Sequence, residues 1–491
     1  MAATSTKLMV LVDTIERLGL AYHFESEIDE KLKQVFNSEE DYDLFTTALR
    51  FRLLRQHRYH VSCDGLDKFV DKDYKLKESL FGDIEGLLSL YEAAHVRIHD
   101  ENILDEAMAF TTHELSNMLA ELESPMKEKV QQALDYPLHK SLTILNLRFY
   151  IPIYEKDELR NELLLRLAKF NFNFLQNIYR NELFQLSTWW NKFDLKSKLP
   201  AYSRDGLIEC YIWGMAFHFE PQYSFIRVMI AKTYQMLTVV DDTYDNYATL
   251  EEAELLTHAF ERWNMDKIDV LPDYMKIVYK FVMSVSEDFE REAERQEISF
   301  AIPYYIEAVK QLCRAYFKEQ KWIMEREMPS FEDYLIHSRI TGLIYVTFTA
   351  LLPGLKSATK ETIDWLLSDP KILVLASELG RLLDDLGSDQ RESREEKMLT
   401  VMECYMKDKG VTKQEVFSRY SELIEDRWKQ LNAEWVNSRS TCTMPKEMVE
   451  QFLNIMQAAE VTYKNNEDGY TYPDKNLTPL VAALLVEPLI I

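Results

Sequence analysis

Apolar residues recur at three- and four-residue spacing along most of the first 190 residues, which is the spacing of one face of an α-helix. The clearest examples are residues 8–18, 100–113 and 115–122. No fixed repeat and no low-complexity tract interrupts this pattern. It predicts a succession of amphipathic helices in the first part of the chain.

A different pattern marks residues 225–245, which are apolar on nearly every side of a helix. Such a helix is usually buried. It ends in Asp241, Asp242 and Asp245, and two of these, Asp241 and Asp245, lie one helical turn apart on the same side. Two buried like charges are costly unless a cation neutralises them, and hard carboxylate oxygens suit Mg²⁺. The alternative for this motif alone is a solvated acidic helix end.

A second apolar helix is predicted over residues 373–386, and it too ends in acids. Asp384, Ser388 and Glu392 follow at i, i+4 and i+8, which places three oxygen donors on one helical stripe. Because the C-terminal end of a helix already carries partial negative charge, acids there add repulsion. Binding of several divalent cations explains the pair of acidic ends better than structural stabilisation does. Arg381, one turn before Asp384, is suited to a phosphate oxygen.

Composition supports long helices and a reducing environment. The 491 residues are 47% hydrophobic and include only 12 Gly and 14 Pro, which favours an all-α protein. The net charge of −25 repels nucleic acid and anionic membranes. The five cysteines are scattered and predict neither a disulfide framework nor a zinc site. The apolar run 480–491 is too short for a bilayer, so we expect no membrane span.

Local signals place several boundaries. Thr249-x-x-Glu252 has the form of a capping box, and residues 412–415 repeat it. Residues 191–206 are predicted to connect two helical layers at the surface. Residues 439–445 and 465–479 are rich in turn residues and are predicted loops, the second of which could fold over a cavity.

Taken together, the two acidic motifs match the sequence pattern of a known protein family. DDTYD at residues 241–245 and DDLGSDQRE at residues 384–392 match the aspartate-rich motif and the second metal motif, (N/D)DxxSxxxE, of one family. ECYIW, FEPQYS and DGYTYP, at residues 209–213, 219–224 and 468–473, are further signatures. From about Lys7 on, the chain resembles the plant class I terpene synthases, most closely the sesquiterpene synthases.

The resemblance implies an all-α fold of two helical domains. Residues 1–168 would form an N-terminal helical domain that lacks its own acid motif, and residues 169–491 a C-terminal metal-binding catalytic domain. Three Mg²⁺ ions, for which Mn²⁺ could substitute, would be held by Asp241, Asp245, Asp384, Ser388 and Glu392. The substrate, a small isoprenoid diphosphate, would be bound by Arg204, Asp241 and Arg381. The resemblance gives catalytic roles to Trp213, Tyr463 and Asp468, with core packing the alternative for Trp213 and loop stabilisation for the other two.

Two departures from the family pattern bear on function. The family's N-terminal arm with paired arginines is missing, and its RxR motif reads Arg204-Asp205-Gly206, without the second arginine. We expect Gly206 to loosen the loop that carries Arg204, and Arg227 or Lys232 could instead supply the missing charge.

The leading hypothesis is a monomeric, cytoplasmic sesquiterpene synthase that ionises and cyclises farnesyl diphosphate to a hydrocarbon or alcohol. The absence of an organelle-targeting leader favours this C15 substrate. The alternatives are a monoterpene synthase acting on geranyl diphosphate, a prenyl chain-elongating transferase, and a catalytically inactive helical binding protein.

Overall fold

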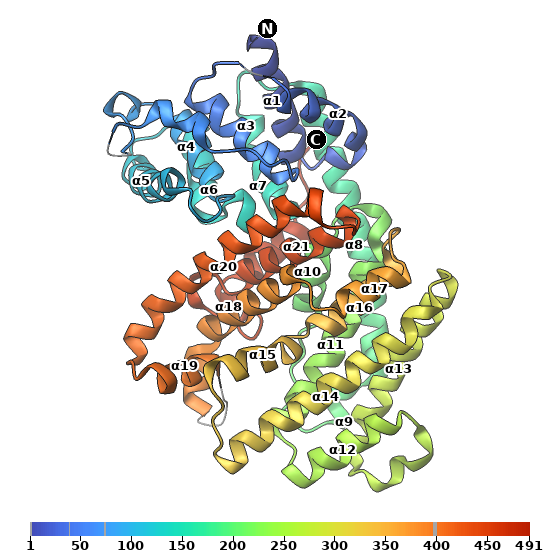
Figure 1. Cartoon of the computed structure of the whole chain (residues 1–491). Coiled ribbons are helices and arrows are strands. Elements are labelled where there is room, and N and C mark those ends of the chain that lie inside the picture. Colours follow the sequence, from blue (N-terminus) through green and yellow to red (C-terminus); the bar gives the residue numbers. More distant parts are fainter. Residues whose placement is uncertain (1, 39, 73–74, 396–399) are drawn as a thin grey trace. The chain divides into compact units, whose positions relative to one another are not determined.

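The computed structural model describes the backbone of residues 2–38, 40–72, 75–395 and 400–491, and their side chains apart from those of residues 2–4, 267 and 390–395. In these ranges the chain forms helices, turns and loops, with one isolated bridge between Val70 and Leu76 (Figure 1). The predicted all-α fold is confirmed. The chain divides into two compact units, which we describe separately.

Unit 1 comprises residues 1–177, 428–449 and 482–491. The predicted domain boundary at residue 168 and the division after Asn177 both fall inside one long helix, α8. Unit 1 additionally takes in segments from the C-terminal part of the chain. Its helices are α1 (Ala2–Arg17), α2 (Glu25–Phe36), α3 (Leu44–Gln56), α4 (Ile84–Ala94), α5 (Asn102–Met118), α6 (Met126–Asp135), α7 (Thr143–Glu155) and the first half of α8 (Glu162–Phe193).

Unit 2 comprises residues 178–427 and 450–481. After the second half of α8 its helices are α9 (Leu195–Lys198), α10 (Leu207–Phe217), α11 (Ser224–Asn246), α12 (Leu250–Arg262), α13 (Asp273–Arg295), α14 (Ile302–Glu325), α15 (Phe331–Thr341), α16 (Ile344–Leu351), α17 (Lys360–Leu366), α18 (Lys371–Glu395), α19 (Val401–Lys409), most of α20 (Lys413–Thr441) and of α21 (Lys446–Thr462), and the start of α22 (Leu477–Leu485).

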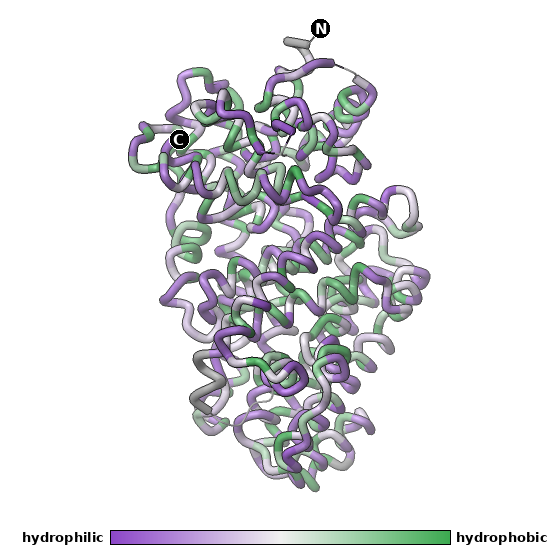
Figure 2. Tube along the Cα trace, turned by 60° about the vertical axis from the view of Figure 1, so that its left-hand side comes forward, coloured by the Kyte–Doolittle hydropathy of each residue, from purple (hydrophilic) through white to green (hydrophobic). Residues whose placement is uncertain are grey.

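Helix α11 is the central element of unit 2. It coincides with the apolar stretch 225–245 and packs against α10, α13, α14 and α16. Most of its side chains are buried, as the sequence predicts for a helix that is apolar all round. Purple and green alternate along many of the helices in Figure 2, which is the pattern of helices with one apolar and one polar face.

Several boundaries follow from local sequence. Thr249 and Glu252 form a complete capping box at the start of α12, and Thr412 exchanges the same two bonds with Glu415 before α20. The loop predicted at residues 439–445 is wrong in its first part, because α20 continues to Thr441. The short helix α9 interrupts the predicted connection between residues 191 and 206.

One segment of the described ranges, Phe331–Gly354, is long and apolar enough to cross a membrane by composition alone. Within this protein, 72% of its most apolar window is buried. A core helix of a folded domain has the same property, so this segment is weak evidence for a membrane span.

Candidate active site

Unit 2 contains a cavity of about 460 Å³ whose walls come from α10, α11, α14, α15, α16, α18, α21 and the loop after α21. A cavity of this size suits a small organic ligand. Much of its surface is apolar or aromatic, with contributions from Trp213, Tyr234, Leu237, Tyr316, Ile323, Tyr334, Ile344, Ala376, Ile455, Met456, Ala459, Tyr463 and Tyr470.

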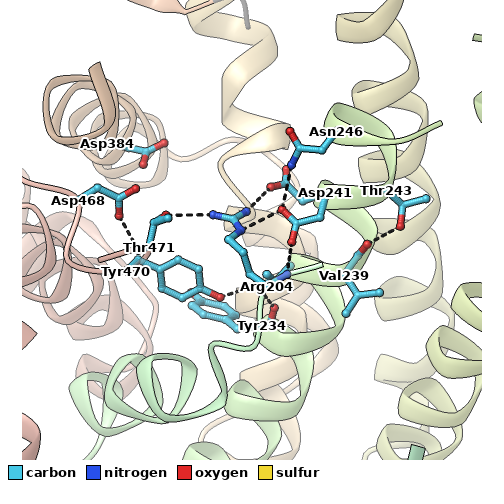
Figure 3. Close-up of polar contacts among 12 residues, drawn as sticks. Arg204, Tyr234, Val239, Asp241, Thr243, Asn246, Asp384, Asp468, Tyr470 and Thr471 are labelled. Atoms are coloured by element: carbon cyan, nitrogen blue, oxygen red, sulfur yellow. Dashed lines mark hydrogen bonds and ion pairs between the residues drawn. The ribbon is translucent and has the colours of Figure 1, made fainter. Parts of the chain in front are cut away.

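The aspartates of the motif at the end of α11 have two different positions: two line the cavity and one is buried against Arg204. Asp241 and Asp245 line the cavity, as predicted from their one-turn spacing. Asp242 is fully buried, and its carboxylate accepts hydrogen bonds from the backbone N–H (2.7 Å) and Nε (2.9 Å) of Arg204. Arg204 Nη2 in turn lies 3.0 Å from Asp241 Oδ2 (Figure 3). Asp242 therefore fixes the arginine that pairs with the cavity-lining aspartate.

The second acidic cluster lies on α18. Asp384 and Asp385 both line the cavity, and Arg381 Nη1 donates to Asp384 Oδ2 at 2.8 Å. Ser388, predicted on the same helical stripe as Asp384, has a buried side chain that is 1% exposed and is not among the cavity-lining residues. Its hydroxyl has no hydrogen-bond partner among the described residues. The side chain of Glu392 lies outside the described residues.

The cavity concentrates negative charge. Burial, together with the neighbouring Asp241, raises the pKa of Asp245 well above its usual value. Burial raises the pKa of Glu319 to about 7, an increase that the guanidinium of Arg381 opposes. It likewise raises the pKa of Asp385 to about 7, again against Arg381. A divalent cation would relieve this crowding by favouring the ionised carboxylates.

The residues present fit a hard divalent metal. Among the described side chains no three carboxylate, imidazole or thiol groups converge on one point; instead each acidic cluster pairs with an arginine. The donors are nevertheless carboxylate and hydroxyl oxygens, the ligands that Mg²⁺ and similar ions prefer. The buried hydroxyl of Ser388, which has no partner among the described residues, fits a metal ligand best, because an unsatisfied buried polar group is costly.

The three predicted catalytic residues have different surroundings. Trp213 is half-buried and lines the cavity, as does Tyr463, whose hydroxyl donates to Asp384. Asp468 is buried and is not among the cavity-lining residues; its Oδ1 accepts from the backbone N–H of Thr471 at 2.9 Å. The contact between Asp468 and Thr471 is the kind that stabilises a loop. The catalytic roles of Trp213, Tyr463 and Asp468 remain predictions.

Sequence reasoning missed several polar groups of the cavity, notably Glu319 and Tyr316 on α14. Tyr316 donates a hydrogen bond to Asp241, and Glu319 accepts one from Thr341 Oγ1 at 3.0 Å. Neither residue belongs to a motif. The available signal was the apolar stripe of α14, in which an acid at position 319 interrupts an otherwise buried face.

The loop that carries Arg204 is tied down rather than loosened by Gly206. The φ angle of Gly206 is −114°, a value open to any residue, and its N–H donates to Gln235 Oε1 at 3.1 Å. The Gln235 amide also donates to the carbonyl of Arg204 at 3.2 Å. The expectation of a loose loop is therefore wrong.

Arg227 and Lys232, which were the candidates to replace the charge of the missing second arginine, form ion pairs with other residues. Arg227 is fully buried and pairs with Glu182 at 2.7 Å, and Lys232 pairs with Asp288 at 2.6 Å. Neither residue lines the cavity.

A side chain at position 206 would meet Tyr470, whose hydroxyl lies 3.1 Å from the place of a Cβ atom. We expect Gly206→Arg to displace Tyr470 from its contacts with Thr238 and Cys210, and to lower turnover about tenfold or more, the rate loss that ~1.4 kcal/mol produces. Gly206→Ala requires a shift of only tenths of an ångström and should stay within about threefold of wild type. Steady-state kinetics compares the two; a gain in substrate affinity for Gly206→Arg would contradict this account.

Ser388→Ala should leave the fold intact while lowering metal-dependent turnover. Because the hydroxyl is buried and has no partner among the side chains that the structure describes, its removal should leave the free energy of unfolding unchanged or raise it by about 1 kcal/mol. The matched control is Ser377→Ala on the same helix, whose cavity-lining hydroxyl donates to the carbonyl of Val374 at 2.8 Å. Denaturation in the absence of metal gives the free energy of unfolding, and a turnover assay in the presence of metal gives the rate. Loss of stability at unchanged rate per folded molecule would make Ser388 structural.

Comparison with known proteins agrees with this geometry. Residues 191–430 match the model of the terpene synthase family metal-binding domain, and residues 1–134 that of the terpene synthase N-terminal domain. The chain is 54% identical to gamma-cadinene synthase from Ocimum basilicum and 52% identical to gamma-curcumene synthase from Pogostemon cablin. Each match covers 100% of this chain and 90% of the relative.

Two solved structures are similar over 99% of this chain. Isoprene synthase from grey poplar leaves, in complex with three Mg²⁺ ions and dimethylallyl-S-thiolodiphosphate, has a TM-score of 0.90, 33% identity and 93% coverage of its own chain. Limonene synthase with 2-fluorolinalyl diphosphate has a TM-score of 0.90, 30% identity and 91% coverage.

A helical unit whose apolar cavity ends in two acidic clusters defines a metal-dependent synthase of the class I type. The chain belongs to the terpene synthase family. It is a terpene synthase, and therefore a lyase, with a metal-binding domain that indicates dependence on a divalent metal.

Proposed function

We propose that this protein is a sesquiterpene synthase that ionises and cyclises farnesyl diphosphate with the help of three Mg²⁺ ions. The observation that carries the proposal is the position of the two acidic clusters, with Arg204 and Arg381, on the wall of one aromatic-lined cavity. Support for a C15 substrate comes from the names of the relatives, which are cadinene and curcumene synthases. Support for three ions comes from the isoprene synthase complex.

The polar end of the cavity is suited to bind and release a diphosphate. Asp241, Asp245 and Asp384, which line this end, would hold the ions together with Glu392 and with Ser388, whose buried side chain is not among the lining residues. When bound, the ions supply the charge that stabilises the leaving diphosphate. Arg204 and Arg381 already lie against these carboxylates, so their remaining N–H groups can donate to phosphate oxygens. Electrostatic stabilisation of the leaving group favours ionisation of the allylic C–O bond.

The remainder of the cavity is suited to hold the carbocation. Its apolar walls leave few groups that could trap the cation, and its aromatic faces attract positive charge without forming a bond. The described residues that line the cavity all belong to unit 2, which supports a monomer. All five cysteines are free, which supports a reducing, cytoplasmic location.

The test is incubation with C10, C15 and C20 isoprenoid diphosphates and Mg²⁺, with products identified by gas chromatography and mass spectrometry. We expect the highest kcat/KM and cyclic products with the C15 substrate. Preference for the C10 substrate would instead make the protein a monoterpene synthase. Absence of turnover with all three diphosphates would favour the alternative hypothesis of a catalytically inactive helical binding protein.

A further inference from the structure

Tyr234 shares one face of α11 with the metal-motif aspartates. Positions 234, 238, 241 and 245 differ by four, three and four residues, so their side chains form one stripe. All four line the cavity. Tyr234 lies two turns before Asp241, about 10 Å along the helix axis. Its ring is therefore deep in the cavity, away from the carboxylates at the end of α11.

At this depth Tyr234 lies beside Trp213. Their ring centroids are 5.9 Å apart and their planes are inclined by 55°. The proximity depends on Gly214, because a Cβ at that position would lie 2.6 Å from the backbone carbonyl oxygen of Arg227 on α11. The close approach of α10 to α11 thus places two aromatic rings on adjacent parts of the cavity wall.

The hydroxyl of Tyr234 is held by the protein. Thr347 Oγ1 on α16 donates to it at 3.1 Å, and Thr347 is fully buried and is not among the cavity-lining residues. This bond anchors the hydroxyl against α16, so Tyr234 contributes its aromatic ring to the cavity wall. Burial also raises the pKa of Tyr234, which keeps the phenol neutral. A neutral ring attracts a cation through its electron-rich face.

We propose that Tyr234 determines the product distribution. Its ring, paired with Trp213 and positioned by Thr347, stabilises positive charge on the part of the isoprenoid that lies deep in the cavity after the diphosphate has left. No bond to Tyr234 forms or breaks; the interaction is between charge and ring. The inference rests on the proposed function and adds a specificity-determining residue, with Thr347 as a positioning residue.

The test replaces Tyr234 by Phe and then by phenylalanines of increasing fluorination. Fluorine withdraws electron density from the ring face with little change of shape, so it weakens attraction for a cation while retaining the packing. We expect the ratio of cyclic to acyclic products to fall along the series by about tenfold in total. A constant ratio along the series would overturn the proposal.

Thr347→Val tests the positioning role. It should shift the product ratio in the same direction as Tyr234→Phe. The double variant should show no additional shift, because both substitutions remove the same hydrogen bond. The control is Tyr305→Phe: this buried hydroxyl lies 3.5 Å from Thr233, the neighbour of Tyr234, but Tyr305 does not line the cavity. Its product ratio should equal that of wild type. An unshifted ratio for Thr347→Val, or fully additive shifts in the double variant, would overturn the positioning role.

The two proposals fail differently. If wild-type protein does not convert the C15 substrate, the proposed function is wrong. If wild-type protein converts it and the fluorinated series leaves the product ratio unchanged, Tyr234 is a packing residue and the proposed function stands.

Discussion

Asp241→Asn is expected to lower turnover at saturating substrate by about 10³-fold or more. The amide keeps an oxygen that can accept from Arg204, so the variant removes charge and metal affinity with little change of shape. Loss of one ligand weakens stabilisation of the leaving diphosphate by several kcal/mol, and each ~1.4 kcal/mol is tenfold in rate. Asp245→Asn should behave in the same way. Release of diphosphate, measured over a range of Mg²⁺ concentrations, provides the comparison.

The matched control is Asp273→Asn, which changes an exposed aspartate that pairs with Lys276 at the start of α13. Its turnover should equal that of wild type. Excess chelator should abolish wild-type turnover, and added Mg²⁺ should restore it. Retention of a tenth or more of the rate by Asp241→Asn, or full activity in chelator, would show that this carboxylate is not a metal ligand.

Arg227→Met is expected to destabilise the fold by about 3–5 kcal/mol while leaving the rate per folded molecule within about threefold of wild type. The Arg227 guanidinium donates to both carboxylate oxygens of Glu182, at 2.9 and 2.7 Å, and to the carbonyls of His218 and Glu220. Removing one member of a buried ion pair leaves the other charge uncompensated. The shift in the urea midpoint, combined with kinetics on the folded fraction, measures both effects.

A double variant, Arg227→Met with Glu182→Leu, is the control. It removes both charges, so much of the lost stability should return, because an apolar pair avoids burying an unpaired carboxylate. An unchanged urea midpoint with a large fall in kcat for Arg227→Met would instead give this arginine the substrate-binding role considered as an alternative in the sequence analysis.

Much of the site could be predicted because its signals are local. The burial of α11 follows from its apolar composition, and the shared orientation of Asp241 and Asp245 follows from helical geometry. The same holds for Asp384 on α18. The capping box at Thr249 depends only on residues within one turn. Each of these features depends only on residues that are close together in the sequence.

The features that could not be predicted depend on packing between distant segments. Ser388 lies on the predicted stripe of oxygen donors, yet its side chain is buried and is not among the residues that line the cavity. Glu319 lines the cavity because α14 packs against α11 and α15, which no motif in its own sequence indicates. Unit 1 includes residues 428–449 because a segment of α20 returns to it from far along the chain. Periodicity gives the buried face of a helix but not its partner.

The proposed metal ligands can be tested by a crystal structure with Mn²⁺ in place of Mg²⁺ and a C15 diphosphate analogue that cannot ionise. Anomalous scattering locates each Mn²⁺ ion directly. We expect three peaks between the carboxylates of Asp241 and Asp245 and the oxygens of Asp384 and Ser388, with Arg204 and Arg381 donating to the diphosphate. Diphosphate bound without ions, or ions at only one of the two acidic clusters, would show that the two clusters do not hold the metal ions together.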